Sequence, residues 1–217
     1  MPNLISLRTV ENAELFKAST PDKKGKDVLY IKLKNGRFSY PHIDKPYKGK
    51  NDKGEEQSKY GVKFMMPYGT HKAAFDLCAE VIEKILKVNG DAILASDRKF
   101  ARDGKDMGEK LYLGHWIVSA NESKQPKARN VDNEVITDNS VKADLFQGGH
   151  WGDIFVRPWF QDGQTFGKGY GKRMNCGLVG IRFTKKDETF GEGQIDDSDA
   201  WDKPDTESND AMAQEEF

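Results

Sequence analysis

Cysteines, metal-ligand spacings and catalytic motifs are scarce or missing in this chain of 217 residues. The two cysteines, Cys78 and Cys176, lie 98 residues apart and form no Cys-x-x-Cys pair. The patterns GxxxxGK[S/T], GxSxG and HExxH do not occur, and no zinc-ligand spacing joins the four scattered histidines, which are His42, His71, His115 and His150. We therefore expect a reduced protein without cofactor, metal ion or catalytic activity.

Long apolar runs are absent as well. No stretch approaches the length of about 18 apolar residues that suggests a membrane helix. The opening MPNLISLRTVENAELF lacks the continuous apolar region of a signal peptide. The sequence thus predicts a cytoplasmic protein that does not enter a membrane.

Net charge is small for the whole chain, at −1, but it is unevenly distributed. Residues 187–217 carry twelve acidic side chains against Lys203 alone, a net charge of −11. Residues 1–186 hold 33 basic and 23 acidic side chains, a net charge of +10. This asymmetry is typical of a protein whose body binds nucleic acid and whose tail meets a charged partner.

Hydrophobic periodicity predicts a mostly β body with one main helix. Residues 70–88 place apolar side chains at helical spacing, after a Thr70 cap and before Asn89-Gly90. A short helix is expected near residues 10–16, with a loop at 21–25. Alternating apolar and polar residues predict strands at 36–43, 59–66, 111–120, 153–160 and 174–184.

Five strands with a helix after the second favour a five-stranded oligonucleotide-binding barrel (OB-fold) with insertions. No alternation of strands and helices supports a doubly wound fold. We expect an N-terminal extension at 1–27, the barrel domain at 28–186 and a disordered acidic tail at 187–217. The tail has too few apolar residues to offset the entropy lost on ordering.

The clearest binding signal is a strand in which aromatic residues flank a cation. In residues 153–161 (DIFVRPWFQ), apolar side chains alternate with Phe155, Arg157 and Trp159. If the apolar face packs on the core, the other face presents two rings and a guanidinium to solvent. Rings stack on bases of any sequence and cations follow the phosphates, which suits a single strand of DNA. The alternative is that Phe155 and Trp159 pack beneath the helix or a loop.

Further cations are candidates for phosphate contacts. Arg37 and Lys63 occupy the polar faces of their strands. One basic loop contributes Lys124, Lys127 and Arg129, and a second contributes Lys168, Tyr170, Lys172 and Arg173. Any one of these lysines, taken alone, is better explained as a solvated surface charge. As a set they display the excess positive charge of the body.

Four segments resemble a known protein family. They are GRFSYPHIDKPY at 36–47, KYGVKFMMP at 59–67, DLFQGGHWGDIFVRPWF at 144–160 and GLVGIRF at 177–183. The family is a phage family once known only as a domain of unknown function and now regarded as single-stranded DNA-binding proteins with an OB-fold. The resemblance covers residues 28–186. It implies a protein of phage DNA replication or recombination in the cytoplasm of the bacterial host cell.

The C-terminus is similar to a second known pattern. Single-stranded DNA-binding proteins of bacteria and tailed phages commonly end in an acidic segment closed by phenylalanine, and this chain ends Glu215-Glu216-Phe217. Bacterial tails have proline where this chain has Glu216, so the phage form is closer. We expect residues 215–217 to enter a basic pocket on a replication protein such as a DNA polymerase or helicase. The alternative is a tail that serves solubility only.

Two functions from different classes follow. The first is a non-enzymatic protein that coats and protects single-stranded DNA and recruits partners through its tail. The second is a protein-interaction module whose acidic tail mimics DNA and whose body does not bind single strands. The basic body favours the first, and self-association is left open. A metal-dependent nuclease is least favoured, because the sequence contains no carboxylate cluster on adjacent strands.

Overall fold

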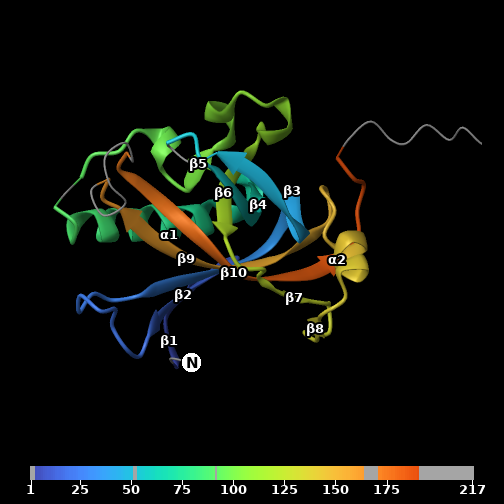
Figure 1. Cartoon of the computed structure of the whole chain (residues 1–217), viewed down its shortest axis with the longest axis horizontal. Helices are drawn as coiled ribbons and strands as arrows, with labels where there is room; N and C mark the ends of the chain where they lie inside the picture. Colours follow the sequence, from blue (N-terminus) through green and yellow to red (C-terminus); the bar gives the residue numbers. More distant parts are fainter. Residues whose placement is uncertain (1–2, 51–52, 91, 164–170, 191–217) are drawn as a thin grey trace, which may run out of the picture.

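The computed structural model describes residues 3–50, 53–90, 92–163 and 171–190. A mostly β body with one long helix is present, as the sequence predicts (Figure 1). The strands are β1 (Leu4–Val10), β2 (Ala13–Ala18), β3 (Leu29–Lys50), β4 (Glu56–Pro67), β5 (Ala101–Asp103), β6 (His115–Glu122), β7 (Lys127–Arg129), β8 (Val135–Ile136), β9 (Trp151–Gln161) and β10 (Arg173–Lys185). The helices are α1 (Tyr68–Lys87) and α2 (Asn139–Leu145), with short 3-10 turns at Ser96–Arg98, Gly104–Met107 and Lys110–Tyr112.

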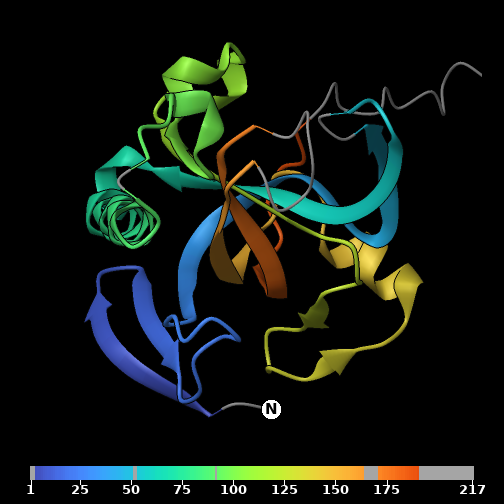
Figure 2. The same cartoon turned by 60° about the vertical axis from the view of Figure 1, so that its left-hand side comes forward.

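The long strand β3 is the spine of the sheet. Its first part pairs with β2 and β9, and its second part pairs with β4. The pairing registers of β3 shift near Asn35 and Tyr40, and both residues have positive φ, at 56° and 46°. Irregularities of this kind bend a strand and increase its twist. One strand can therefore belong to two differently oriented parts of the sheet, as Figure 2 shows.

The five predicted strands do not close into a barrel. They are the second part of β3 with β4, β6, β9 and β10, and they pair in the order β6-β4-β3-β9-β10. β10 and β6 lie against each other, but no ladder joins them among the described residues. The sheet is open, and its paired path runs on from β6 to β5 and from β10 to β7 and β8. The mostly β body is confirmed, but a five-stranded barrel is not, because β6 and β10 do not pair within the described ranges and short strands extend the sheet beyond them.

Helix α1 packs its apolar stripe on the core, with Ala74, Leu77 and Cys78 among the fully buried residues. It begins at Tyr68, earlier than predicted, and Pro67 stands at the N-cap. The Thr70 hydroxyl bonds the His71 ring instead of capping the helix. Both cysteines are free and buried, and burial raises the pKa of the Cys78 thiol to about 12.

The N-terminal segment is a hairpin, and the expected helix near residues 10–16 was wrong. β1 and β2 pair through a turn at Glu11-Asn12, where Asn12 has a φ of 57°. Asparagine tolerates this left-handed conformation better than most residues, which favours a turn. β2 then pairs with β3, so this segment extends the same sheet. None of the described helices is long and apolar enough to cross a membrane.

Candidate nucleic-acid interface

The outer face of β9 carries the three residues that the sequence singles out. Ile154 and Val156 are buried, whereas Phe155 and Trp159 are half-buried and Arg157 is exposed. This alternation is the one expected from the sequence. The name "β9 face" is used below for Phe155, Arg157 and Trp159. Their contact with DNA remains a prediction.

Phe155 stands in a small aromatic cluster. Its ring stacks on Tyr30 of β3, with centroids 5.4 Å apart and planes at 11°. Phe16 of β2 meets it edge-on at 5.9 Å. The N-terminal strands therefore hold this ring in place on the surface of the sheet. The ring is half-buried and packs against two other aromatic rings.

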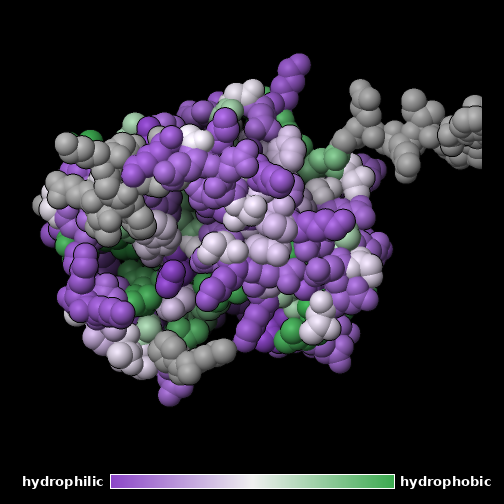
Figure 3. Space-filling model, in the orientation of Figure 1, coloured by the Kyte–Doolittle hydropathy of each residue, from purple (hydrophilic) through white to green (hydrophobic). Residues whose placement is uncertain are grey.

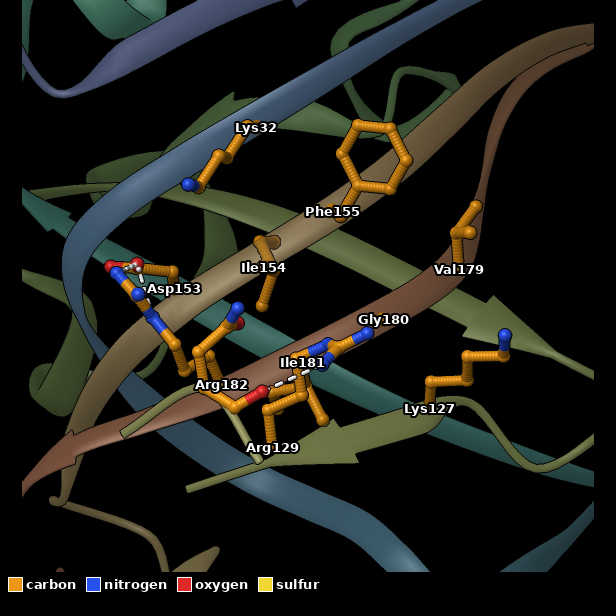
Figure 4. Close-up of a pocket in the computed structure, with 11 residues that line it drawn as sticks. Lys32, Lys127, Arg129, Asp153, Ile154, Phe155, Val179, Gly180, Ile181 and Arg182 are labelled. Atoms are coloured by element: carbon orange, nitrogen blue, oxygen red, sulfur yellow. Dashed lines mark hydrogen bonds and ion pairs between the residues drawn. The ribbon is translucent and has the colours of Figure 1, made fainter. Parts of the chain in front are cut away.

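A cationic groove of about 320 Å³ lies beside Phe155. Strand pairing sets four of its residues in one row across the sheet, in the order Lys32, Phe155, Gly180 and Lys127. Arg182 of β10 and Arg129 of β7 form part of the next row. Figure 4 shows these side chains on four adjacent strands, with Phe155 standing between Lys32 and Val179. The groove thus combines one aromatic ring with four cations.

A second groove, of about 740 Å³, continues along the other end of the β9 face. Arg157 and Trp159 line it together with Lys24 and Lys84. Figure 3 shows a hollow on the left-hand side of the molecule, where apolar surface lies between hydrophilic side chains. The acidic residues Asp22, Asp27 and Asp162 also line this groove, so it is less basic than the first.

Arg37, a predicted DNA contact, is engaged with the segment that follows β10. Its guanidinium donates to the Gly149 carbonyl at 2.8 Å and the Glu188 carbonyl at 2.9 Å. It also lies over the Phe190 ring, 4.4 Å from the centroid. Arg37 therefore stabilises the packing of this segment on the body.

The indole of Trp151 helps to hold the same segment. Its Nε1 donates to Asp187 at 2.6 Å, which lowers the pKa of that carboxyl. Residues 187–190, which the sequence assigns to the tail, are therefore packed on the body.

Lys63 is likewise held by neighbours on the outer face of β4. Its ammonium lies 3.1 Å from a Glu109 oxygen and about 5 Å from the ring centroids of Tyr40 and Tyr112. Burial disfavours its charge, but hydrogen bonds with Tyr112 and Glu109 outweigh burial and raise the pKa of Lys63. Lys63 and Arg37 line neither groove along β9.

The remaining predicted contacts fall in several places. Lys127 and Arg129 line the cationic groove, and Lys124 is exposed in the turn before β7. Lys172 and Arg173 lie at the start of β10, where Arg173 pairs with Gln161 at the end of β9. Lys168, Tyr170, Glu215, Glu216 and Phe217 lie outside the described residues. Within the described ranges, no group of three or more His, Cys, Asp or Glu residues could hold a metal ion.

Sequence reasoning missed Tyr30, which stacks on Phe155, and five groove residues, namely Lys24, Lys26, Lys32, Lys84 and Arg182. A signal for two of them was present. In LYIKL at 29–33, the buried Leu29, Ile31 and Leu33 alternate with Tyr30 and Lys32, which is the pattern of a half-buried strand. Lys24 and Lys84 come from a loop and a helix, and only the fold brings them beside Trp159.

Comparison with known proteins gives the family. Residues 29–212 match the sequence profile of a family described as Enterobacter phage Enc34, ssDNA-binding protein. The chain belongs to this Enc34 family. The solved structure of the single-stranded DNA-binding protein from bacteriophage Enc34 is 35% identical, with a TM-score of 0.71, over 92% of this chain and 99% of that one.

Two further structures of the Enc34 protein are similarly close. Its complex with ssDNA is 34% identical with a TM-score of 0.71, over 87% of this chain and 98% of that one. A C-terminal truncation is 32% identical with a TM-score of 0.70, over 86% of this chain and 98% of that one. No curated protein sequence matches the chain.

Proposed function

We propose that this member of the Enc34 family binds single-stranded DNA without sequence preference, through the β9 face and the cations beside it. Membership of a family whose solved relative forms a complex with ssDNA is the observation that carries the proposal. The two grooves along β9 supply what such binding needs. Lysines and arginines bind phosphates of any sequence, and aromatic rings stack on any base.

The proposal extends to the biological role of the chain. We assign the five central strands to an opened OB-fold, in which β6 and β10 approach without pairing. The protein would coat and protect single strands during phage DNA replication or recombination and would catalyse no reaction. The acidic tail would recruit a replication protein, such as a polymerase or helicase, through its closing Phe217.

Charge reversal at two matched positions tests the site. Arg157→Glu places a negative charge on the β9 face, and Lys72→Glu makes the same change on α1, where Lys72 pairs with Asp76 away from both grooves. Titration of tryptophan fluorescence with poly(dT) should show weaker binding for Arg157→Glu. Lys72→Glu should bind almost as the unchanged protein does, because only net charge is altered.

Two outcomes would oppose the proposal. Equal effects of the two substitutions would mean that binding depends on net charge and not on the β9 face. A folded, unchanged protein that does not bind poly(dT) would favour the other function class, a protein-interaction module with a DNA-mimicking tail.

A further inference from the structure

Two arginines on neighbouring strands line the cationic groove. The parallel pairing of β10 and β7 sets Arg182 opposite Arg129, and both side chains line the groove (Figure 4). Like charges directly across a strand pair destabilise a sheet unless an anion compensates them. Of these two, only Arg182 has a carboxylate partner among the described residues. Arg129 donates to the Asn133 carbonyl at 2.7 Å, which leaves its charge uncompensated.

A buried carboxylate fixes Arg182 in position. Asp153 is 3% exposed and accepts from both Nε and Nη2 of Arg182, with the Nε bond at 3.0 Å. Its other oxygen accepts from the backbone N–H of Asn35 at 3.0 Å. The guanidinium is therefore held by one edge, and its Nη1 group is left for a ligand. This arrangement suits a phosphate oxygen, which accepts strong hydrogen bonds from arginine.

The Phe155 ring has one side open to the same groove. Tyr30 of β3 stacks on one side of the ring, and β10 flanks β9 on the other side. The β10 residue in register with Phe155 is Gly180, which has no side chain, and Val179, at the bulge before it, lines the same groove. A Cβ at Gly180 would meet only the Lys127 carbonyl, at 3.3 Å. The space above Gly180 is therefore open groove.

We propose that this end of the groove is a nucleotide subsite for single-stranded DNA, an inference that rests on the proposed function. A base stacks on Phe155 in the space that Gly180 leaves, and the adjacent phosphate binds Arg129 and Arg182. Residues two apart on a strand are separated by about 7 Å, so Phe155 and the row of Arg182 lie within reach of one nucleotide. Asp153 is a positioning residue that orients Arg182.

Filling the space tests the base contact without changing charge. Gly180→Val should lower the affinity for an oligo(dT) by about 5- to 150-fold, the range for loss of one stacked base. Heparin, a polyanion without bases, should bind with unchanged affinity. Phe155→Leu keeps an apolar side chain but removes the π-face, so it should reproduce the result if Gly180→Val fails to fold.

Changing the arginines tests the phosphate contact. The double variant Arg129→Lys/Arg182→Lys keeps both charges but loses the planar fork that binds phosphate. This variant should bind both oligo(dT) and heparin more weakly than the unchanged protein does. Arg8→Lys is the matched control, because Arg8 pairs with Glu80 outside the groove, and it should change neither.

The subsite is overturned if Gly180→Val and Phe155→Leu, both folded, bind oligo(dT) as tightly as the unchanged protein. The subsite is also overturned if the two variants lose affinity for heparin and for oligo(dT) equally. Failure of the unchanged protein to bind oligo(dT) would instead overturn the proposed function itself.

Discussion

At the scale of single residues, the same side-chain type has different roles according to its neighbours. Arg157 is exposed beside a groove, whereas the Arg37 guanidinium donates hydrogen bonds to two carbonyl groups and lies over an aromatic ring. Both arginines alternate with apolar residues in the sequence, so the pattern marks them as equivalent. The contacts of Arg37 with Gly149 and with residues 188 and 190 separate them.

Trp159 provides the first prediction. If its ring stacks on a base, Trp159→Ala should weaken single-stranded DNA binding by about 1–3 kcal/mol with little loss of folding stability. Trp116, which stacks on Phe75 at 5.1 Å and packs on the core, is the control. Trp116→Ala should lower the melting temperature. A large loss of stability in Trp159→Ala, with unchanged affinity per folded molecule, would make Trp159 a core residue.

Arg37 provides the second prediction. Arg37→Ala removes hydrogen bonds from a charged donor, so it should lower the free energy of unfolding by about 1.5–3 kcal/mol. Affinity for oligo(dT) should stay nearly unchanged, because the side chain lines neither groove along β9. Urea unfolding and fluorescence titration measure the two quantities. A loss of affinity for oligo(dT) with unchanged stability would show that Arg37 contacts DNA.

At the scale of elements, sequence patterns find what is locally periodic. The strands at 153–160 and 174–184 and the helix at 70–88 recur within a few residues of their predicted bounds. Their periodicity survives because each packs one whole face on the core. The same reasoning found Phe155, Arg157 and Trp159, which share one face of β9.

Elements that depend on distant partners could not be found in this way. β7 has three residues and β8 has two, too few to show a period. The strand expected from residue 111 begins at His115, because Tyr112 is buried in a 3-10 turn against Met65 and Ile117. The cationic groove needs β3, β9, β10 and β7 side by side, and that order is a property of the whole sheet.

The N-terminal hairpin yields an element-scale prediction. Its second strand pairs with β3 and brings Phe16 against Phe155, and Ala13 is fully buried. Deleting residues 1–20 should lower the free energy of unfolding by more than about 1.5 kcal/mol, because burial of a single apolar side chain already contributes that amount. Urea unfolding of the two chains measures this. Equal stabilities would show that residues 1–20 do not contribute to the stability of the body.

At the scale of the whole molecule, opposite charges are joined in one chain. Residues 191–217 carry ten acidic side chains and Lys203, a net charge of −9. Tethering keeps this charge at high effective concentration near the basic body. We therefore expect the tail to compete with DNA phosphates for lysines and arginines. Removing residues 191–217 should tighten binding to oligo(dT), most at low salt, because screening shortens the range of the charges.

The tail prediction needs two controls. Replacing the ten acidic residues by Asn and Gln should tighten binding as truncation does, because charge and not chain length causes the competition. Deleting Phe217 alone should leave DNA affinity nearly unchanged and abolish capture of the partner. Equal affinities of the intact and truncated chains at low salt would show that the tail does not reach the DNA site.

The most direct test of the central claim is the affinity of the intact protein for an oligo(dT) and for a duplex of equal length across a series of salt concentrations. For oligo(dT), log K should fall linearly with log salt, with a slope of about −0.7 for each phosphate contacted. The duplex should bind more weakly at every salt concentration, because its bases are not free to stack on the β9 face. An affinity that does not change with salt, or a duplex bound as tightly as the single strand, would contradict the account.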